Sequence, residues 1–541
     1  MAAVPQYSYR IVFTDKAGSP ALSSTPSWLS ARALARRANF GIALDSNDIP
    51  VSPRYIDSVL RITGGKMHNT SRWLNQCVIL ITDSSSVPSL RAKPWVKSVT
   101  WTGVFKSGLH REAPGAVNPK AETVGPLAEP GRMKGAGSAS YYGASWWQTA
   151  MVHGDTLHDQ GFRGRGKLIA LLDEGYIEAD QHYGFDSLRQ QGRLLETYNF
   201  LLDTSFIYDY DTHGTQSLST IAGLIPGSYV GTAPDAQFAL YLTEDIGFAD
   251  ALYEIDNLVA GMERADSIGA DVISASLGYN TFNSPLISGY GHSDLDGRNT
   301  IPDKAVSIAT QKGMLYVASA GNEGDNSWNY LMTPGDADSA LSVGAVNDSG
   351  RAAGFSSPGP NASGHVKPDI CMKGAPAAVF NTGNGIVSGS GTSFSAPQAA
   401  GYAACLMQAF PTLPPAIIHQ AFIHIASLYP LSDKKLGYGI PDFRLAQKFL
   451  AQFLPDPKAD PVRVYPNPFG SSFTLVLPGI SAPYSLELVD ILGRKLGFTT
   501  RLDVTTKGVL LQITPEAAAS GMYFLNAIID GQLHTFKLVR L

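Results

Sequence analysis

The chain has 541 residues, with 41 Lys or Arg, 46 Asp or Glu and a formal net charge of −5. This length favours two to four domains, and the charge balance gives no sign of a nucleic-acid-binding protein. No apolar run reaches the roughly 18 residues that a membrane-spanning helix needs, so no membrane span is expected. Residues 1–5 contain no apolar signal-peptide core; either the protein is not exported, or a signal peptide has been removed.

The sequence contains three cysteines, Cys77, Cys371 and Cys405. Because they are odd in number and far apart, a disulfide framework is not expected, and no spacing suits zinc. We interpret all three as small hydrophobic residues of the core.

Residues 1–106 have the pattern of a small α+β domain. Their apolar periodicity predicts three strands and two helices, over 7–13, 76–82 and 95–101, and over 27–40 and 53–62. Arg32, Arg36 and Arg37 lie on the first of these helices, and we interpret them as a solvated face.

Residues 107–140 break this periodicity. The stretch is rich in Pro and Gly, which indicates an exposed linker of the kind that is cut by proteases.

Residues 141–455 alternate between apolar strands and helices. The strands are expected at 167–172, 237–242, 271–275, 314–318 and 341–346, and the helices at 249–268 and 302–312. This alternation predicts an α/β fold with a doubly wound, mostly parallel sheet, which binds ligands beyond the carboxyl ends of its strands. Short alternating segments in residues 462–541 predict an all-β sandwich.

The stretch Gly391–Pro397, of sequence GTSFSAP, suggests a nucleophile at the start of a helix. Gly391 and Thr392 precede Ser393, and small residues follow it. The unpaired N–H groups of a first helical turn favour the negative charge that forms when a serine attacks a carbonyl. Pro397 is expected in that first turn, where its missing N–H costs little.

A nucleophilic serine requires a base and an acid that orients the base. Asp173 follows the apolar strand 167–172 directly, and His213 begins a helix of small residues. Taken singly, Asp173 is better explained as a loop residue that caps a turn. His213 is explained equally well as a surface or core histidine.

Two further strands are followed by residues that could contribute to an active site at the carboxyl edge of the sheet. Gly321 and Asn322 follow strand 314–318, and the Asn322 amide could donate to an oxyanion. Ser276, Leu277 and Gly278 follow strand 271–275 and could pair with an extended peptide. An ordinary turn is the alternative at both positions.

Together, these segments resemble the subtilisin-like serine peptidases (subtilases) over residues 145–450. The matching segments are Ile169–Asp173, His213–Thr215, Ser276–Gly278, Ser319–Asn322, Phe355–Ser357, Lys367–Ile370 and Gly391–Pro397. The resemblance implies that Ser393 is the nucleophile, His213 the base and Asp173 its orienting acid. It also implies that Asn322 assists the oxyanion hole, that Ser276, Leu277, Gly278, Gly321, Gly391 and Thr392 bind substrate, and that the chemistry requires no cofactor.

The flanking regions resemble known companions of secreted Bacteroidetes subtilases. Residues 7–106 look like the propeptide; the matching segments are Trp28–Ser30 and Ser71–Asn75. Residues 462–541 resemble the type IX secretion sorting domain. Their matching segments are Tyr465–Phe469, Asp490–Gly493 and Gly521–Tyr523. The implied partners are polypeptide substrates, the chain's own N-terminal domain as an intramolecular inhibitor, and the secretion machinery. Maturation is expected within residues 107–145. A generic immunoglobulin-like binding module is the alternative for residues 462–541.

Two features depart from the family pattern. Glu174 follows Asp173 where the family usually has Ser or Thr, and this second carboxylate would raise the pKa of His213. Residues 280–300 form an insertion in which Asp294 and Asp296 are candidate ligands of a structural Ca²⁺, although a solvated loop explains them better.

We therefore predict a secreted or cell-surface serine endopeptidase that is made as an inhibited precursor. Two alternatives stay open: a catalytically silent peptide-binding surface protein, and an adhesin whose function lies in residues 462–541. Residues 325–335 match no pattern that would define which side chain the enzyme prefers at the cleavage site.

Overall fold

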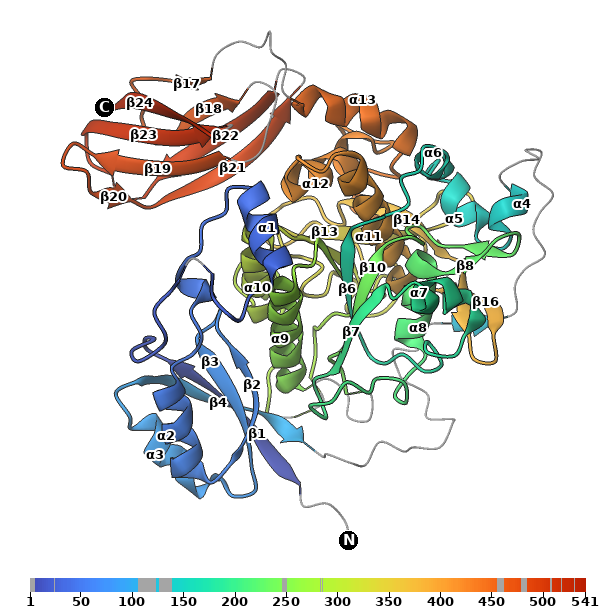
Figure 1. Cartoon of the computed structure of the whole chain (residues 1–541), viewed down its shortest axis with the longest axis horizontal. Coiled ribbons are helices and arrows are strands. Elements are labelled where there is room, and N and C mark those ends of the chain that lie inside the picture. Colours follow the sequence, from blue (N-terminus) through green and yellow to red (C-terminus); the bar gives the residue numbers. More distant parts are fainter. Residues whose placement is uncertain are drawn as a thin grey trace.

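The structure is a computed structural model of the whole chain. It describes residues 5–23, 25–105, 123–125, 139–245, 251–282, 284, 286–454, 462–477, 484–505, 508–516, 518–529 and 531–541. Figure 1 shows an N-terminal domain (blue), a large central domain (cyan to orange) and a C-terminal β domain (red).

The N-terminal domain is a four-stranded antiparallel sheet with helices, as the α+β pattern predicts. The strand order is β2-β3-β1-β4. Its main elements are β1 (Gln6–Phe13), α1 (Ala31–Asn39), α2 (Pro53–Thr63), β2 (Lys66–Ser71), β3 (Gln76–Ile81), α3 (Val87–Arg91) and β4 (Val96–Phe105). Helix α1 begins later than the periodicity predicts because the Ser30 hydroxyl caps it by accepting a hydrogen bond from the Ala33 N–H at 3.1 Å.

The central domain contains a seven-stranded parallel sheet with the order β14-β13-β12-β11-β6-β10-β7, which confirms the predicted fold class. The strands are β6 (Leu168–Asp173), β7 (Leu194–Asn199), β10 (Gln237–Leu242), β11 (Val272–Ala275), β12 (Leu315–Ser319), β13 (Leu341–Asn347) and β14 (Ile370–Ala375). The sequence pattern predicts five of them but neither edge strand, β7 or β14.

Helices cover both faces of this sheet, and the alternation of strand side chains explains why. Ile169 and Leu171 of β6 pack in one core with α8 (His213–Ala222) and α11 (Thr392–Ala409). The intervening Leu168, Ala170 and Leu172 pack in a second core with α9 (Leu252–Ile268) and α10 (Ile301–Gln311). Every residue of β6 is therefore buried, as its continuous apolar run indicates.

Smaller elements complete the central domain. They are α4 (Ala139–Tyr142), α5 (Trp146–Ala150), α6 (Asp155–Asp159), α7 (Asp186–Gln190), β8 (Leu224–Ile225), β9 (Tyr229–Val230), β15 (Ala377–Asn381), β16 (Gly385–Ser390), α12 (Pro415–His424) and α13 (Ala446–Leu450). Within the predicted linker, β5 (Thr123–Gly125) pairs antiparallel with β16. The rest of that linker, 107–122 and 126–138, lies outside the described residues.

The C-terminal domain consists of two four-stranded antiparallel sheets, as predicted for residues 462–541. Their orders are β17-β18-β22-β21 and β20-β19-β23-β24. The strands are β17 (Arg463–Tyr465), β18 (Phe473–Leu477), β19 (Tyr484–Asp490), β20 (Lys495–Leu496), β21 (Phe498–Thr505), β22 (Gly508–Pro515), β23 (Gly521–Ile529) and β24 (Gln532–Arg540). Among the helices that the structure describes, none has the length and apolar character needed to cross a membrane.

The buried residues confirm one expectation and correct another. Cys77, Cys371 and Cys405 are buried free thiols, and burial raises the pKa of each. The interpretation of the α1 arginines as a solvated face is wrong. Arg36 and Arg37 are only 6% and 2% exposed, because α1 packs against the central domain and both side chains pair with Asp266.

Two buried carboxyl groups lie close together, Asp303 of α10 and Asp336 of the loop between β12 and β13. Asp303 accepts a hydrogen bond from the Thr333 hydroxyl at 2.9 Å, and Asp336 accepts one from the Gly297 N–H at 3.0 Å. Burial raises the pKa of both groups, and the neighbouring Asp303 helps to raise the pKa of Asp336 to about 8. Folding therefore favours the protonated form of Asp336.

This raised pKa predicts a stability that falls as pH rises. Between the ordinary aspartate pKa of 3.8 and about 8, the folded state keeps a proton on Asp336 that the unfolded state releases. We expect the thermal unfolding midpoint of the central domain to fall by about 5 °C between pH 5 and pH 8. In Asp336→Asn this fall should be smaller, measured by scanning calorimetry. The exposed Asp325→Asn is the control, and an unchanged pH dependence in Asp336→Asn would contradict the assignment.

Candidate active site

The candidate site lies at the carboxyl edge of the parallel sheet. Asp173 is the last residue of β6, Ser276 directly follows β11, and Asn322 lies three residues beyond β12. Because β6, β11 and β12 are adjacent and parallel, these three residues emerge at the same edge.

Asp173 and His213 form a hydrogen-bonded pair. The Nδ1 of His213 and the Oδ1 of Asp173 are 2.5 Å apart, and their side chains are 13% and 2% exposed. Asp173 also accepts a hydrogen bond from the Glu174 N–H at 2.8 Å, and Asp211 accepts one from the His213 N–H at 2.7 Å. The carboxylate of Asp173 thus fixes the His213 ring with Nδ1 protonated and Nε2 as the basic nitrogen.

Ser393 is the second residue of α11 and is 5% exposed. Its hydroxyl donates to the Ser276 carbonyl oxygen at 3.3 Å. The ring of the next residue, Phe394, has its centroid 6.1 Å from that of His213. The helix start therefore lies against the Asp173–His213 pair.

Pro397 is the sixth residue of α11, in its second turn, which corrects the expectation of a first-turn position. Because proline has no N–H, the carbonyl of Ser393, four residues earlier, lacks its helical hydrogen bond. The hydroxyls of Ser276 and Ser217 donate to this carbonyl oxygen instead, at 3.0 and 3.5 Å. Ser217 was missed by sequence reasoning, although it lies one helical turn after His213 on the same face of α8.

Asn322 is held by the residue that precedes Ser393. Its side-chain oxygen accepts hydrogen bonds from both the backbone N–H and the hydroxyl of Thr392, each at 2.9 Å. These bonds determine which end of the amide is the nitrogen. The preceding Gly321 has φ +108°, and its carbonyl accepts a hydrogen bond from the Ser357 N–H at 3.0 Å. A side chain at Gly321 would be strained in this backbone conformation.

The remaining predicted substrate residues border the same edge. Leu277 is buried, and a Cβ at Gly278 would lie 2.9 Å from the Cβ of Met332. Tyr279 and Thr333 exchange backbone hydrogen bonds of 2.8 and 3.2 Å, which joins the Ser276–Gly278 segment to the loop after β12. Met332 belongs to residues 325–335, a stretch whose sequence defines no preference at the cleavage site.

Gly391 and Thr392 form the turn into α11. Gly391 has an extended backbone (φ 173°), and its N–H donates to the Gly374 carbonyl oxygen at 2.9 Å. Thr392 is fully buried. This turn is thus tied both to β14 and to Asn322.

The carboxylates of the candidate calcium ligands accept hydrogen bonds from backbone N–H groups of their own turns. Asp294 is exposed and accepts a hydrogen bond from the Gly291 N–H at 2.7 Å, and Asp296 accepts from the Arg298 and Asn299 N–H groups at 3.0 and 2.9 Å. Among the described residues, no group of three or more His, Cys, Asp or Glu side chains could hold a metal.

Comparison with protein families gives three consecutive matches. Residues 8–114 match the peptidase S8 propeptide domain of Bacteroidota, 164–439 match the subtilase family, and 463–540 match the secretion system C-terminal sorting domain. The second match covers just over half of the chain and contains all the candidate site residues.

Curated relatives match the same central region. The chain is 28% identical over 267 residues to a thermostable alkaline protease of Halalkalibacterium halodurans, covering 49% of this chain and 63% of the relative. It is 29% identical over 266 residues to subtilisin E of Bacillus subtilis (49% and 61%) and 28% identical over 267 residues to subtilisin BL of Lederbergia lenta (49% and 85%). The chain thus spans a little over 60% of the length of the first two relatives. With its parallel sheet, its Asp173–His213 pair and the match over 164–439, the chain belongs to the subtilase family.

Proposed function

We propose that the protein is a secreted or cell-surface serine endopeptidase in which Ser393, His213 and Asp173 form the catalytic triad. The observation that carries this proposal is the 2.5 Å hydrogen bond between Asp173 and His213 Nδ1, beside the helix that begins with Thr392 and Ser393. The subtilase match supports the same chemistry. The substrates are polypeptides, and the reaction requires no cofactor.

In the proposed reaction, the Ser393 hydroxyl turns from the Ser276 carbonyl toward Nε2 of His213 and attacks the peptide carbonyl carbon. His213 takes the hydroxyl proton, and Asp173 stabilises the resulting imidazolium. When the tetrahedral intermediate collapses, His213 returns this proton to the leaving amine. Water then attacks the acyl-enzyme by the same route and releases the second product.

The negative charge of the intermediate is stabilised by the Ser393 N–H and the Asn322 side-chain amide. Two hydrogen bonds from Thr392 occupy the amide oxygen of Asn322, so its nitrogen is the end that donates. Donors that are oriented in advance stabilise the developing charge without reorganisation. The Ser276 and Ser217 hydroxyls support this arrangement because they hold the carbonyl of Ser393 itself.

The flanking domains fit a precursor that is exported. Residues 1–106 act as an intramolecular inhibitor, 107–140 as the linker that is cut, 141–455 as the peptidase, and 462–541 as a sorting domain read by the secretion machinery. The matches to a propeptide domain and a sorting domain support this division. If the chain were instead a silent peptide binder, a fluorophosphonate probe would not label Ser393.

Two substitutions test the catalytic roles. Ser393→Ala should lower kcat by about 10⁶-fold, and Asn322→Ala by about 10²–10³-fold, which are magnitudes found in subtilisin itself. Asn322→Ala should still be labelled by the fluorophosphonate probe, whereas Ser393→Ala should not. Cleavage of a peptide library, followed by mass spectrometry, measures the activity of both variants. Equal activity in Asn322→Ala and the wild type would remove Asn322 from the mechanism.

Maturation in the linker is a separate prediction. Wild-type protein should acquire a new N-terminus within residues 107–145, and Ser393→Ala should remain uncut because the cut depends on its own serine. N-terminal sequencing after equal incubation distinguishes the two. Equal processing of both proteins would show that another protease makes the cut.

Glu174 should influence the pH profile. A second negative charge beside the triad favours the imidazolium, so Glu174→Gln should move the acidic limb of kcat/KM to lower pH, by roughly half a unit. Asp159→Asn, which removes an exposed carboxylate of α6 outside the triad, serves as the control. An unchanged acidic limb in Glu174→Gln would mean that the charge of Glu174 is screened from His213.

A further inference from the structure

The segments that follow β11 and β12 border a space beyond the ends of these strands. Ala275 and Ala318 are register partners in the sheet, and Gly278 and Gly321 each lie three residues further along the chain. The side chain of Met332 lies beside both glycines. We call the space between Gly278 and Gly321 the glycine slot.

Met332 enters the glycine slot from the loop between β12 and β13. A Cβ on Gly278 would lie 2.9 Å from the Cβ of Met332 and 3.6 Å from its terminal carbon, Cε. A Cβ on Gly321 would lie 3.1 Å from Cγ and 3.2 Å from Sδ of the same side chain. Each side-chain atom of Met332 is therefore close to one of the two glycines, and the residue is only 6% exposed. The methionine thus fills the space between them.

The glycine slot adjoins the reacting atoms of the proposed mechanism. Asn322, the proposed oxyanion donor, directly follows Gly321, and the Ser393 hydroxyl donates to the Ser276 carbonyl oxygen at 3.3 Å. An extended peptide that pairs with residues 276–278 directs successive side chains to opposite sides of its strand. When the carbonyl oxygen of one peptide residue lies at Asn322, the side chain of that residue points into the slot. The slot therefore receives the residue before the cleaved bond.

The backbone around Met332 is fixed by the residue that follows it. The Thr333 hydroxyl donates to the buried Asp303 at 2.9 Å, and the Thr333 backbone exchanges hydrogen bonds of 2.8 and 3.2 Å with Tyr279. A methionine side chain is flexible, but here its backbone cannot withdraw from the slot unless these buried hydrogen bonds break. The position of the side chain is therefore set before any substrate binds.

The insertion at residues 280–300 supports the same loop. The His292 ring stacks on Tyr330 with centroids 4.4 Å apart, and its Nε2 donates to the Trp328 carbonyl oxygen at 3.0 Å. The Trp328 indole N–H in turn donates to the carbonyl oxygen of Leu331 at 2.7 Å, directly before the methionine. The insertion thus packs against the loop that fills the glycine slot.

The groups around the two glycines are uncharged. The atoms nearest to a Cβ on either glycine belong to Met332, to the Thr333 carbonyl oxygen and to the Ser357 hydroxyl, which lies 2.7 Å from the Cβ position of Gly321. A charged substrate side chain would lose water here without gaining an ionic partner. A long apolar side chain would overlap with the methionine, and overpacking a filled site is unfavourable. Small uncharged side chains are the ones that fit.

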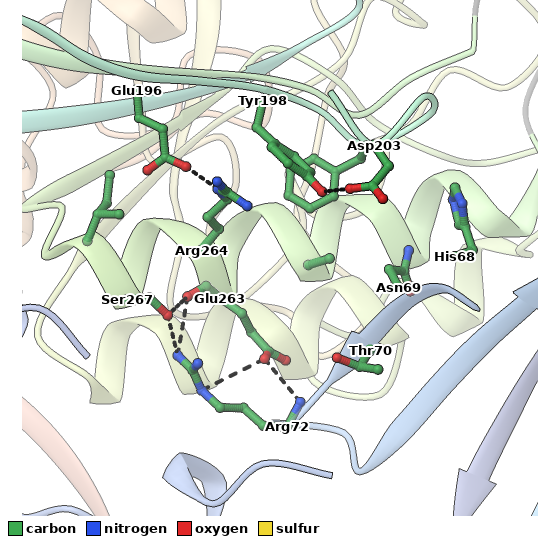
Figure 2. Close-up of a pocket in the computed structure, with 13 residues that line it drawn as sticks. His68, Asn69, Thr70, Arg72, Glu196, Tyr198, Asp203, Glu263, Arg264 and Ser267 are labelled. Atoms are coloured by element: carbon green, nitrogen blue, oxygen red, sulfur yellow. Dashed lines mark hydrogen bonds and ion pairs between the residues drawn. The ribbon is translucent and has the colours of Figure 1, made fainter. Parts of the chain in front are cut away.

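A cavity elsewhere in the molecule does not serve this purpose. Figure 2 shows this cavity of about 430 Å³, which is lined by side chains from residues 68–72, 196–203 and 260–268. Charged groups in its wall pair with one another, as Arg264 does with Glu196. Its lining segments do not include those that follow β11 and β12, so the cavity does not receive the residue before the cleaved bond.

We propose that Met332 determines the substrate preference of the peptidase by closing the glycine slot, so that the enzyme cleaves polypeptides after small uncharged residues such as glycine, alanine and serine. The methionine acts through its size, in direct contact with the substrate side chain. This inference rests on the proposed function, because the slot selects substrates only if Ser393 attacks the peptide carbonyl beside it.

The preference is tested with matured enzyme and peptides that differ only in the residue before the cleaved bond, which is glycine, alanine, leucine or phenylalanine. In the wild type, kcat/KM should fall by about 100-fold from alanine to phenylalanine. In Met332→Ala, the ratio of kcat/KM for phenylalanine to that for alanine should rise by about 100-fold, because the missing thioether leaves room for the ring.

Matched variants separate the size of this side chain from a general effect of losing a methionine. Met332→Leu keeps the volume of the side chain and should keep the preference for alanine. Met407→Ala removes a methionine that is equally buried (5% exposed) near the end of α11, and it should leave the ratio unchanged. If Met332→Ala does not fold, the milder Met332→Val decides, with an expected rise in the ratio of about 10-fold.

The outcomes distinguish this inference from the proposed function. If the wild type cleaves after phenylalanine as efficiently as after alanine, or if shortening Met332 leaves the ratio unchanged, Met332 does not set the preference, and the peptidase assignment still stands. If none of the proteins hydrolyses any peptide and the fluorophosphonate probe does not label Ser393, the proposed function fails and this inference fails with it.

Discussion

The parallel register of the central sheet is the constraint on which the site depends. Because β6, β11 and β12 run side by side in one direction, the residues that follow them must emerge at one edge. This brings Asp173, Ser276 and Asn322 together, although they are far apart in the chain. At this edge the side chains are close enough to form hydrogen bonds, such as the one between Asp173 and His213.

Helix α11 packs in the core along its length and also carries Ser393 near its start. Its small residues, including Ala399 and Ala400, let it lie in the core against the sheet. Pro397 interrupts its hydrogen bonding one turn after Ser393, and Ser217 and Ser276 compensate through their hydroxyls. The interruption thus connects the start of α11 to α8 and β11, the elements that carry His213 and the substrate edge.

The sequence allowed prediction of the fold and of the candidate site residues because their signals are local. Apolar runs mark buried strands, and Asp173, His213 and Ser393 each adjoin such a run or open a helix. The burial of Arg36 could not be predicted, because its partner Asp266 lies 230 residues away in the chain. The spacing of the arginines would also be the same in an amphipathic helix whose arginines face solvent. The edge strands β7 and β14 were missed because Glu196 and Lys373 interrupt their apolar pattern.

Both ends of α9 hold the N-terminal domain through buried charges. Near its first turn, Arg10 of β1 pairs with Asp256, and in its last turn Asp266 pairs with Arg37 and Arg72. A buried ion-pair cluster contributes little net stability compared with apolar packing, but it penalises any partner that lacks the matching charges. These pairs are therefore better suited to selecting the correct N-terminal domain than to stabilising the fold.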